Sequence, residues 1–132
     1  MELKIFTIIT HGIITIELII IYIDLISNYL LKMNKNSNIN NLLIKFRSQY
    51  LNHSTNEYLE TASLYDCLLY MENGKNLLTK EESSFLYEIF TNNIKLFSEI
   101  SNTKNIDFLW SSNNTIIRLQ LIDILIKKFN FK

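Results

Sequence analysis

Few side chains in this chain could perform chemistry, and they lie far apart in the sequence. The 132 residues include two histidines, His11 and His53, and one cysteine, Cys67. Three such residues are too few for a histidine-rich zinc site, and we expect Cys67 to be an inert buried thiol. The two glycines, Gly12 and Gly74, are too few for a phosphate-binding loop. The sequence therefore predicts no metal, no cofactor and no enzymatic activity.

Arg47 and His53 are the pair of residues whose spacing has a precedent in a catalytic family. In the segment RSQYLNH they resemble the R-x(4–6)-H motif of HEPN ribonucleases, which are small all-helical proteins. In that family the Arg and the His lie together across a dimer interface and act on RNA phosphodiesters. The resemblance covers these seven residues and the helical character, and it implies Arg47 and His53 as catalytic residues of a ribonuclease. Because His53 directly precedes a predicted helix cap at Ser54, we expect it in a loop and not on the helix of Arg47.

Charged residues of the N-terminal third are candidates for an anchor or a partner contact. Residues 27–53 contain no acid and four bases: Lys32, Lys35, Lys45 and Arg47. The formal charge of the whole chain is zero, which argues against a nucleic-acid-binding protein, because such a protein needs a net basic surface. Glu17 is a further candidate, because it interrupts an apolar run in which a carboxylate would need a partner if the run crossed a membrane.

The composition favours helices over strands. The chain is 48% hydrophobic and 20% charged, with no proline and two glycines. Strand-rich folds need many tight turns that glycine provides, so we predict an all-α fold, a compact bundle of about five helices in a single domain, 1–132. The 22 Ile and 17 Asn residues indicate an AT-rich genome, such as a viral or organellar one. We expect an intracellular protein, with membrane-associated and organellar locations as alternatives.

The most apolar segment comprises residues 5–26, IFTIITHGIITIELIIIYIDLI, and it has three alternative interpretations. In the first, it is the central helix of the bundle, buried on nearly all sides, with a thin polar stripe that includes Glu17. In the second, residues 5–23 form a membrane helix, for which the insertion free energy sums to about zero. In the third, residues 5–10 and 13–18 pair as a β-hairpin.

Two capping boxes predict where helices begin. Residues 54–57, Ser-Thr-Asn-Glu, are expected to open a helix that continues to about residue 73. Gly74 suits the left-handed position that commonly follows a helix. Residues 79–82, Thr-Lys-Glu-Glu, are expected to open another helix that continues to about residue 101.

Two further helices are predicted at about residues 39–51 and 115–129, with loops at 34–38 and 102–114. The second loop is expected to contain one helical turn. The expected core residues of these segments are Leu42, Leu43, Phe46, Tyr50, Phe85, Leu86, Ile89, Phe90, Ile94, Phe97, Ile100, Ile106, Phe108, Leu109 and Trp110. A polar stripe at Gln120, Asp123, Lys127 and Asn130 is expected to face water on the last helix.

These observations favour a non-catalytic interaction protein. We expect a structural subunit of a larger assembly, with a protein partner, anchored through residues 5–26; a membrane contact through residues 5–23 is the alternative anchor. A second alternative is a soluble regulator that holds a partner's amphipathic helix in an apolar groove. Compact helical proteins of the viral Bcl-2-like type have this size and a buried central helix, so the chain resembles them in fold only.

Overall fold

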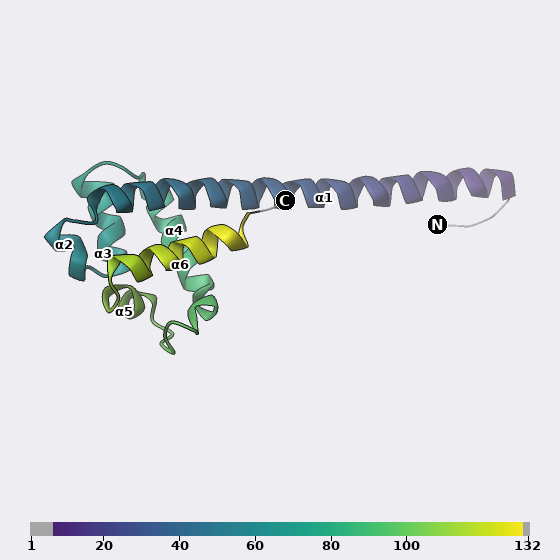
Figure 1. The fold of residues 1–132 in the computed structure, drawn as a ribbon. Helices are drawn as coiled ribbons and strands as arrows, with labels where there is room; N and C mark the ends of the chain where they lie inside the picture. The colour runs from purple at the N-terminus through teal and green to yellow at the C-terminus, as the bar shows by residue number, and fades with distance from the viewer. Residues whose placement is uncertain (1–6, 131–132) are drawn as a thin grey trace. The chain divides into compact units, whose positions relative to one another are not determined.

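The computed structural model describes residues 7–130, and the side chains from residue 15 onward. In chain order the elements are α1 (Thr7–His53), α2 (Glu57–Thr61), α3 (Leu64–Leu69), the π-helix η1 (Tyr70–Gly74), α4 (Lys80–Asn92), the 3₁₀-helix η2 (Ile94–Phe97), α5 (Ile106–Ser111) and α6 (Thr115–Lys128) (Figure 1). No strand occurs between residues 7 and 130, so the predicted all-α class is confirmed. The hairpin alternative is wrong over the described residues, because residues 7–18 are helical; residues 5 and 6 and the side chain of His11 lie outside the description.

Helix α1 is longer than predicted. The sequence favoured a loop at residues 34–38, whereas the helix continues without interruption from Thr7 to His53. Asn and Ser cost only a few tenths of a kcal/mol each in a helix, and Asn40 just beyond them is fixed by its side-chain Nδ2, which donates to the Ile126 carbonyl at 2.7 Å. The chain nevertheless divides into two compact units, Met1–Asn36 and Ser37–Lys132, and this boundary falls inside the predicted loop.

The first unit is exposed. None of the described side chains from residue 15 to residue 36 is buried. Twelve large apolar side chains have exposed fractions of 39–66%: Ile16, Leu18, Ile19, Ile20, Ile21, Tyr22, Ile23, Leu25, Ile26, Tyr29, Leu30 and Leu31. The prediction that residues 5–26 form the buried central helix is therefore wrong for the described side chains, those of residues 15–26. Among the described residues, no helix has the length and apolar character needed to cross a membrane.

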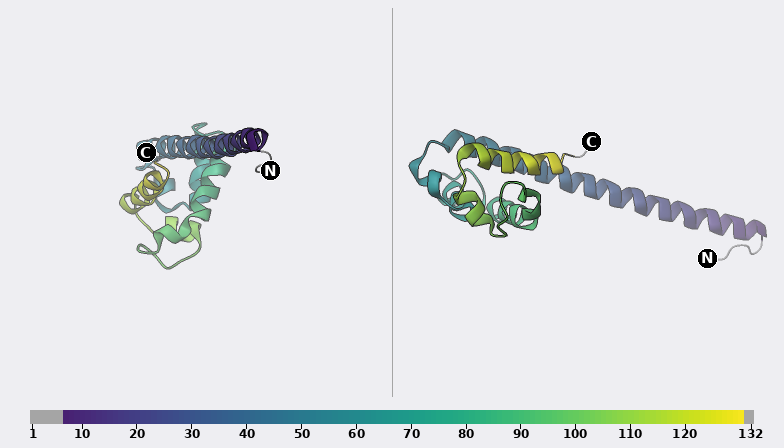
Figure 2. Two further views of the ribbon diagram at one scale, coloured as in Figure 1. Left: turned by 90° about the vertical axis from the view of Figure 1, so that its right-hand side faces the viewer. Right: turned by 60° about the horizontal axis from the view of Figure 1, so that its bottom comes forward.

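The second unit has a continuous core. Leu43, Phe46 and Tyr50 of α1 are fully buried, as predicted from their helical spacing. Helix α6 lies antiparallel to this part of α1 (Figures 1 and 2), with Asp123 bonded to Arg47 and Ile126 bonded to Asn40. Trp110 of α5 lies at the centre of the aromatic residues, with ring centroids 5.3 Å from Tyr50, 5.7 Å from Phe90 and 6.0 Å from Phe46.

The predicted helix over residues 54–73 is interrupted, and its cap is different. Asn56, and not Ser54, is the N-cap of α2, because its side-chain oxygen accepts from the Tyr58 N–H at 2.8 Å. The helix stops at Ala62, and Ser63 caps the next helix, α3. The carbonyl oxygens of residues 59, 60 and 62, which a continuous helix would use internally, instead accept N–H groups of a distant arginine, described below.

The end of this region also differs from the prediction. After α3 the chain continues as the π-helix η1, which ends at Gly74. No described glycine has a positive φ; the left-handed residue is Asn76, with a φ of 57°. Asparagine tolerates this region better than most residues, and it takes the position predicted for Gly74.

The capping box at Thr79 is confirmed. The Thr79 hydroxyl accepts from the Glu82 N–H at 3.1 Å, and the Glu82 carboxylate accepts from the Thr79 N–H at 2.9 Å. Helix α4 ends at Asn92, earlier than predicted, and Asn93 donates through its side chain to the Ile89 carbonyl at 2.7 Å. Of the expected core residues of α4, Leu86, Ile89 and Phe90 are buried, whereas Phe85 is 36% exposed.

Replacing Glu82 with glutamine isolates the charge of this cap, because Gln can keep the cap hydrogen bond. The Thr79 N–H, and then the Lys45 ammonium at 2.9 Å, lower the pKa of Glu82. A lowered pKa contributes stability above the unfolded-state pKa, and this contribution disappears as the pH falls through the folded-state pKa. We expect Glu82→Gln to lower the free energy of unfolding by about 0.5–1 kcal/mol near pH 7.

Urea unfolding of both proteins near pH 7 and again near pH 2–3 measures this difference. The two free energies should converge as the pH falls through the folded-state pKa of Glu82, because the carboxyl group is then protonated in both states. A difference that is the same at both pH values would show that the carboxylate charge has no role.

The last third follows the predictions in outline. The expected helical turn is α5, and Ile106, Leu109 and Trp110 are buried, but Phe108 is 60% exposed. Helix α6 has Asn114 as its N-cap. Gln120, Asp123 and Lys127 of its predicted polar stripe are exposed as expected, and Asn130, also exposed, lies beyond the end of the helix at Lys128.

Candidate functional site

The structure does not bring the two residues of the HEPN-like motif together within the chain. His53 is the last residue of α1, so the expectation that it lies in a loop, off the helix of Arg47, is wrong. Because Arg47 and His53 are six positions apart on one α-helix, their side chains leave the helix in directions about 120° apart. Arg47 instead binds Asp123, with Nε 2.7 Å from Oδ1, and His53 Nδ1 lies 2.9 Å from the Gln49 carbonyl oxygen.

The other charged candidates also lie apart. Lys45 binds the Glu82 carboxylate, with Nζ 2.9 and 3.0 Å from its two oxygens. Lys45 and Arg47 are therefore engaged within the second unit, and the predicted basic segment is not a uniform basic patch. Lys32 and Lys35 are exposed in the first unit, and Glu17 is half-buried there.

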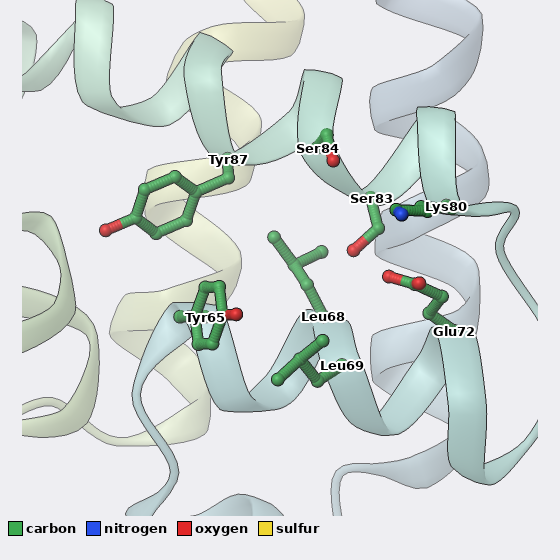
Figure 3. A pocket seen from close by; sticks show the side chains of 8 residues that line it. All are labelled: Tyr65, Leu68, Leu69, Glu72, Lys80, Ser83, Ser84 and Tyr87. Carbon is green, nitrogen blue, oxygen red and sulfur yellow. The ribbon is translucent and has the colours of Figure 1, made fainter.

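A pocket lies between α3, η1 and α4, and sequence reasoning did not find it (Figure 3). Its volume is about 240 Å³. The rings of Tyr65 and Tyr87 line one end, and Glu72, Lys80 and Ser83 lie at the other. Sites for drug-sized ligands usually measure roughly 300–1,000 Å³, so this space suits a single side chain or a small group.

Asp107 of α5 fixes the aromatic end of the pocket. One of its oxygens accepts from the Tyr65 N–H at 2.9 Å, and the other accepts from the Tyr87 hydroxyl at 2.6 Å. This hydrogen bond raises the pKa of Tyr87 to about 12, with burial as a second cause. The Tyr87 hydroxyl is therefore protonated and engaged at neutral pH, which makes it a structural donor and not a base.

A second groove lies between η2 and α6, with a volume of about 400 Å³. Leu96, Ile100 and Ile124 supply its apolar surface, and Asp123, on its edge, is the residue that binds Arg47. One charged residue of this groove, Asp123, is therefore already engaged in an ion pair that holds α6 to α1.

Cys67 is buried, as predicted. Its side chain is fully enclosed in the core, and burial raises the pKa of its thiol to about 12, although the nearby Arg118 acts in the opposite direction. A thiol with this pKa is unreactive at neutral pH. Within the described part of the chain, no three His, Cys, Asp or Glu side chains gather in a way that could hold a metal ion.

Arg118 is the buried charge that sequence reasoning missed. It is 1% exposed, and its guanidinium carbon lies 5.5 Å from the centre of the Trp110 ring. The signal was present in the sequence, because Arg118 lies off the polar stripe of its helix, two residues before the exposed Gln120. Its contacts are structural and make no opening to solvent, so it is not a site for a ligand.

The feature with the largest exposed apolar surface is the segment of α1 from residue 16 to residue 31. A helix that is apolar on most of its circumference is normally enclosed by other elements. Here all twelve large apolar side chains of the segment are exposed, whereas the second unit buries most of its large apolar side chains in one cluster and exposes single ones, such as Phe108 and Ile116. Contiguous exposed apolar surface of this kind typically marks an interaction site.

Comparisons with known proteins add no relative. No family model, no curated protein and no solved structure matches the chain.

Proposed function

We propose that the chain is a non-catalytic interaction protein, in which the second unit is a folded helical domain and residues 16–31 of α1 bind protein. The single observation that supports this is the exposure of twelve large apolar side chains on sixteen consecutive residues. Burying a Leu or Ile side chain contributes about 1.5–3 kcal/mol, so covering even half of this surface would drive a stable association.

The contrast with the second unit supports the same proposal. There every helix contributes buried apolar residues to one core, although single large apolar side chains such as Phe108 and Ile116 stay exposed. The apolar segment is also continuous with a helix that the core fixes at Leu43, Phe46 and Tyr50. The binding element is thus already helical and loses little conformational freedom on association.

A thiol introduced at position 23 tests whether protein covers the segment. Ile23→Cys and Ile44→Cys form a matched pair, because both positions are isoleucines of α1 with exposed fractions of 54% and 49%. Cys67 stays unlabelled in both, since it is buried and its pKa is about 12. The proposed function predicts that a thiol reagent labels position 23 at least about tenfold more slowly than position 44 in the assembled protein.

The rates should be measured on the purified full chain, and then in an extract of the cells from which the chain comes. In urea the two positions should react equally. Protection at position 23 that disappears when the extract is first digested with a protease identifies a protein cover. Equal rates at both positions under all native conditions would contradict the proposed function. So would protection that is absent from the purified chain, appears only in the extract and survives the protease.

A further inference from the structure

We infer that the partner of the apolar segment is the same segment of two or three further copies of this chain. The inference rests on the proposed function and names its partner. It starts from the order of the exposed apolar side chains along α1, which follows a heptad repeat. The residues of this seam are Ile16, Ile19, Ile23, Ile26, Leu30 and Met33.

The spacing of the seam alternates between three and four residues over its whole length. Such a repeat places a large apolar residue at each a and d position between residues 16 and 33. Two helices pack along a seam of this kind when both have the same repeat, because each side chain then enters a hole formed by four residues of the facing helix. A second copy of the chain supplies the matching repeat without further assumptions.

The residues on the seam and beside it favour an assembly of more than two chains. Ile16 and Ile23 at a, with Ile19 and Ile26 at d, form the pattern that shifts coiled coils from dimers towards trimers and tetramers. The apolar face is also wider than a two-stranded seam. Leu18 and Leu25 occupy c positions and Tyr22 and Tyr29 occupy g positions, all exposed by more than half. A dimer would leave the c positions in water, whereas a bundle of three or four helices covers more of them.

Four polar residues lie opposite the seam, whereas Ser27 and Asn34 occupy e positions and Lys32 a c position; the apolar Ile21 and Leu31 also lie opposite the seam, at f and b. Glu17 and Asp24 occupy b positions, and Asn28 and Lys35 occupy f positions, which face outward in a coiled coil. Two acids near the start of this stripe also argue against a lipid surface as the cover, because helices that lie on membranes usually carry Lys and Arg on their polar face.

The available area is sufficient for a stable assembly. Twelve Ile, Leu and Tyr side chains, each about half exposed, present on the order of 1,000 Å² per chain, whereas a standard interface takes about 800 Å² from each partner. The segment therefore provides the surface of a full interface without any contribution from the second unit.

Two isoleucines with equal exposure test the inference. Ile19, on the seam, and Ile21, at an f position, are each 51% exposed in the single chain. Neither Ile19→Ser nor Ile21→Ser should change the fold of the second unit, which circular dichroism and thermal melting can verify. Sedimentation equilibrium of the full chain should give three or four times the chain mass of 15.6 kDa for the unsubstituted protein.

We expect Ile19→Ser to raise the concentration at which the assembly dissociates by at least about tenfold, and Ile21→Ser to change it much less. A wild-type chain that sediments as a monomer at all attainable concentrations would overturn the inference, as would equal effects of the two substitutions. If the chain is a monomer but position 23 is still protected by another protein, self-association is wrong and the proposed function stands. If the chain is a monomer and position 23 is unprotected, both are wrong.

Discussion

Replacing Arg118 with methionine is expected to lower the free energy of unfolding by about 3–5 kcal/mol, a large part of the 5–15 kcal/mol that folded domains usually have. The guanidinium donates from Nε to the Trp110 carbonyl at 2.9 Å and from Nη1 to the Tyr50 hydroxyl at 3.1 Å. It also donates to three carbonyl oxygens at the end of α2: from Nη1 to Leu59 at 2.5 Å, and from Nη2 to Glu60 at 2.8 Å and Ala62 at 3.5 Å. Methionine has a similar length but donates none of these bonds. Each buried acceptor that is left without a donor costs about 1–3 kcal/mol.

The location of these acceptors explains why the charge is tolerated without a carboxylate. Leu59 and Glu60 lie in the last turn of α2, and Ala62 is its C-cap. The carbonyl oxygens at the C-terminus of a helix lack internal partners and carry partial negative charge, so a cation is favoured there. Arg118 thus satisfies the end of α2 and also joins α2 to α5 and α1.

Arg47 is the matched control, because the chain has only these two arginines. Its ion pair with Asp123 is exposed, with side-chain exposed fractions of 36% and 51%, so Arg47→Met should cost less than about 1 kcal/mol. Urea unfolding followed by circular dichroism and by the fluorescence of the single tryptophan, Trp110, measures both variants. Equal losses for the two arginines would refute the role assigned to Arg118.

Replacing Phe90 with alanine is expected to destabilise the protein by about 3–5 kcal/mol. Phe90 is fully buried and lies edge-on to both Phe46 and Trp110, with ring centroids 6.0 and 5.7 Å away. Removing its ring leaves a cavity bordered by aromatic side chains, which cannot move far enough to fill it because they pack against one another.

Phe108→Ala is the control for this substitution. The helical turn predicted within residues 102–114 was expected to bury Phe108, but the residue is 60% exposed, so its loss should change the free energy of unfolding by no more than about 0.5 kcal/mol. The midpoints and slopes of urea unfolding for both alanine variants give the comparison. A loss at Phe108 as large as the loss at Phe90 would mean that the structure assigns the wrong aromatic side chains to the core.

The sequence predicts correctly those parts of the fold in which neighbouring residues allow only one local structure. The Thr79 capping box has its hydroxyl and its carboxylate three residues apart, and both bonds form. The box at Ser54 failed because Asn56, two residues later, is an equally good cap, and the register between them is not a local property. The break after α2 could not be predicted, because the group that replaces its internal bonds comes from Arg118, more than fifty residues away.

The sequence predicts where the candidate site lies, but it does not predict that the apolar side chains of the site are exposed. The run of isoleucines marks the segment in the sequence, whereas its exposure depends on how much core the rest of the chain can form by itself. The second unit fills its core with residues from Ile39 onward and leaves no need for the segment before it. The pocket between Tyr65 and Tyr87 gave no sequence signal, because Asp107, which fixes it, lies on a different helix.

The pairing of α1 with α6 has a consequence for how the chain is made. Asn40 bonds to Ile126 and Arg47 to Asp123, separations of 86 and 76 residues. A ribosome therefore releases this part of α1, including the buried Tyr50, long before it has synthesised Arg118 and the rest of α6 that bond to it. The second unit therefore completes its core only after α6 has been synthesised, and until then chaperones can bind the uncovered apolar side chains of α1.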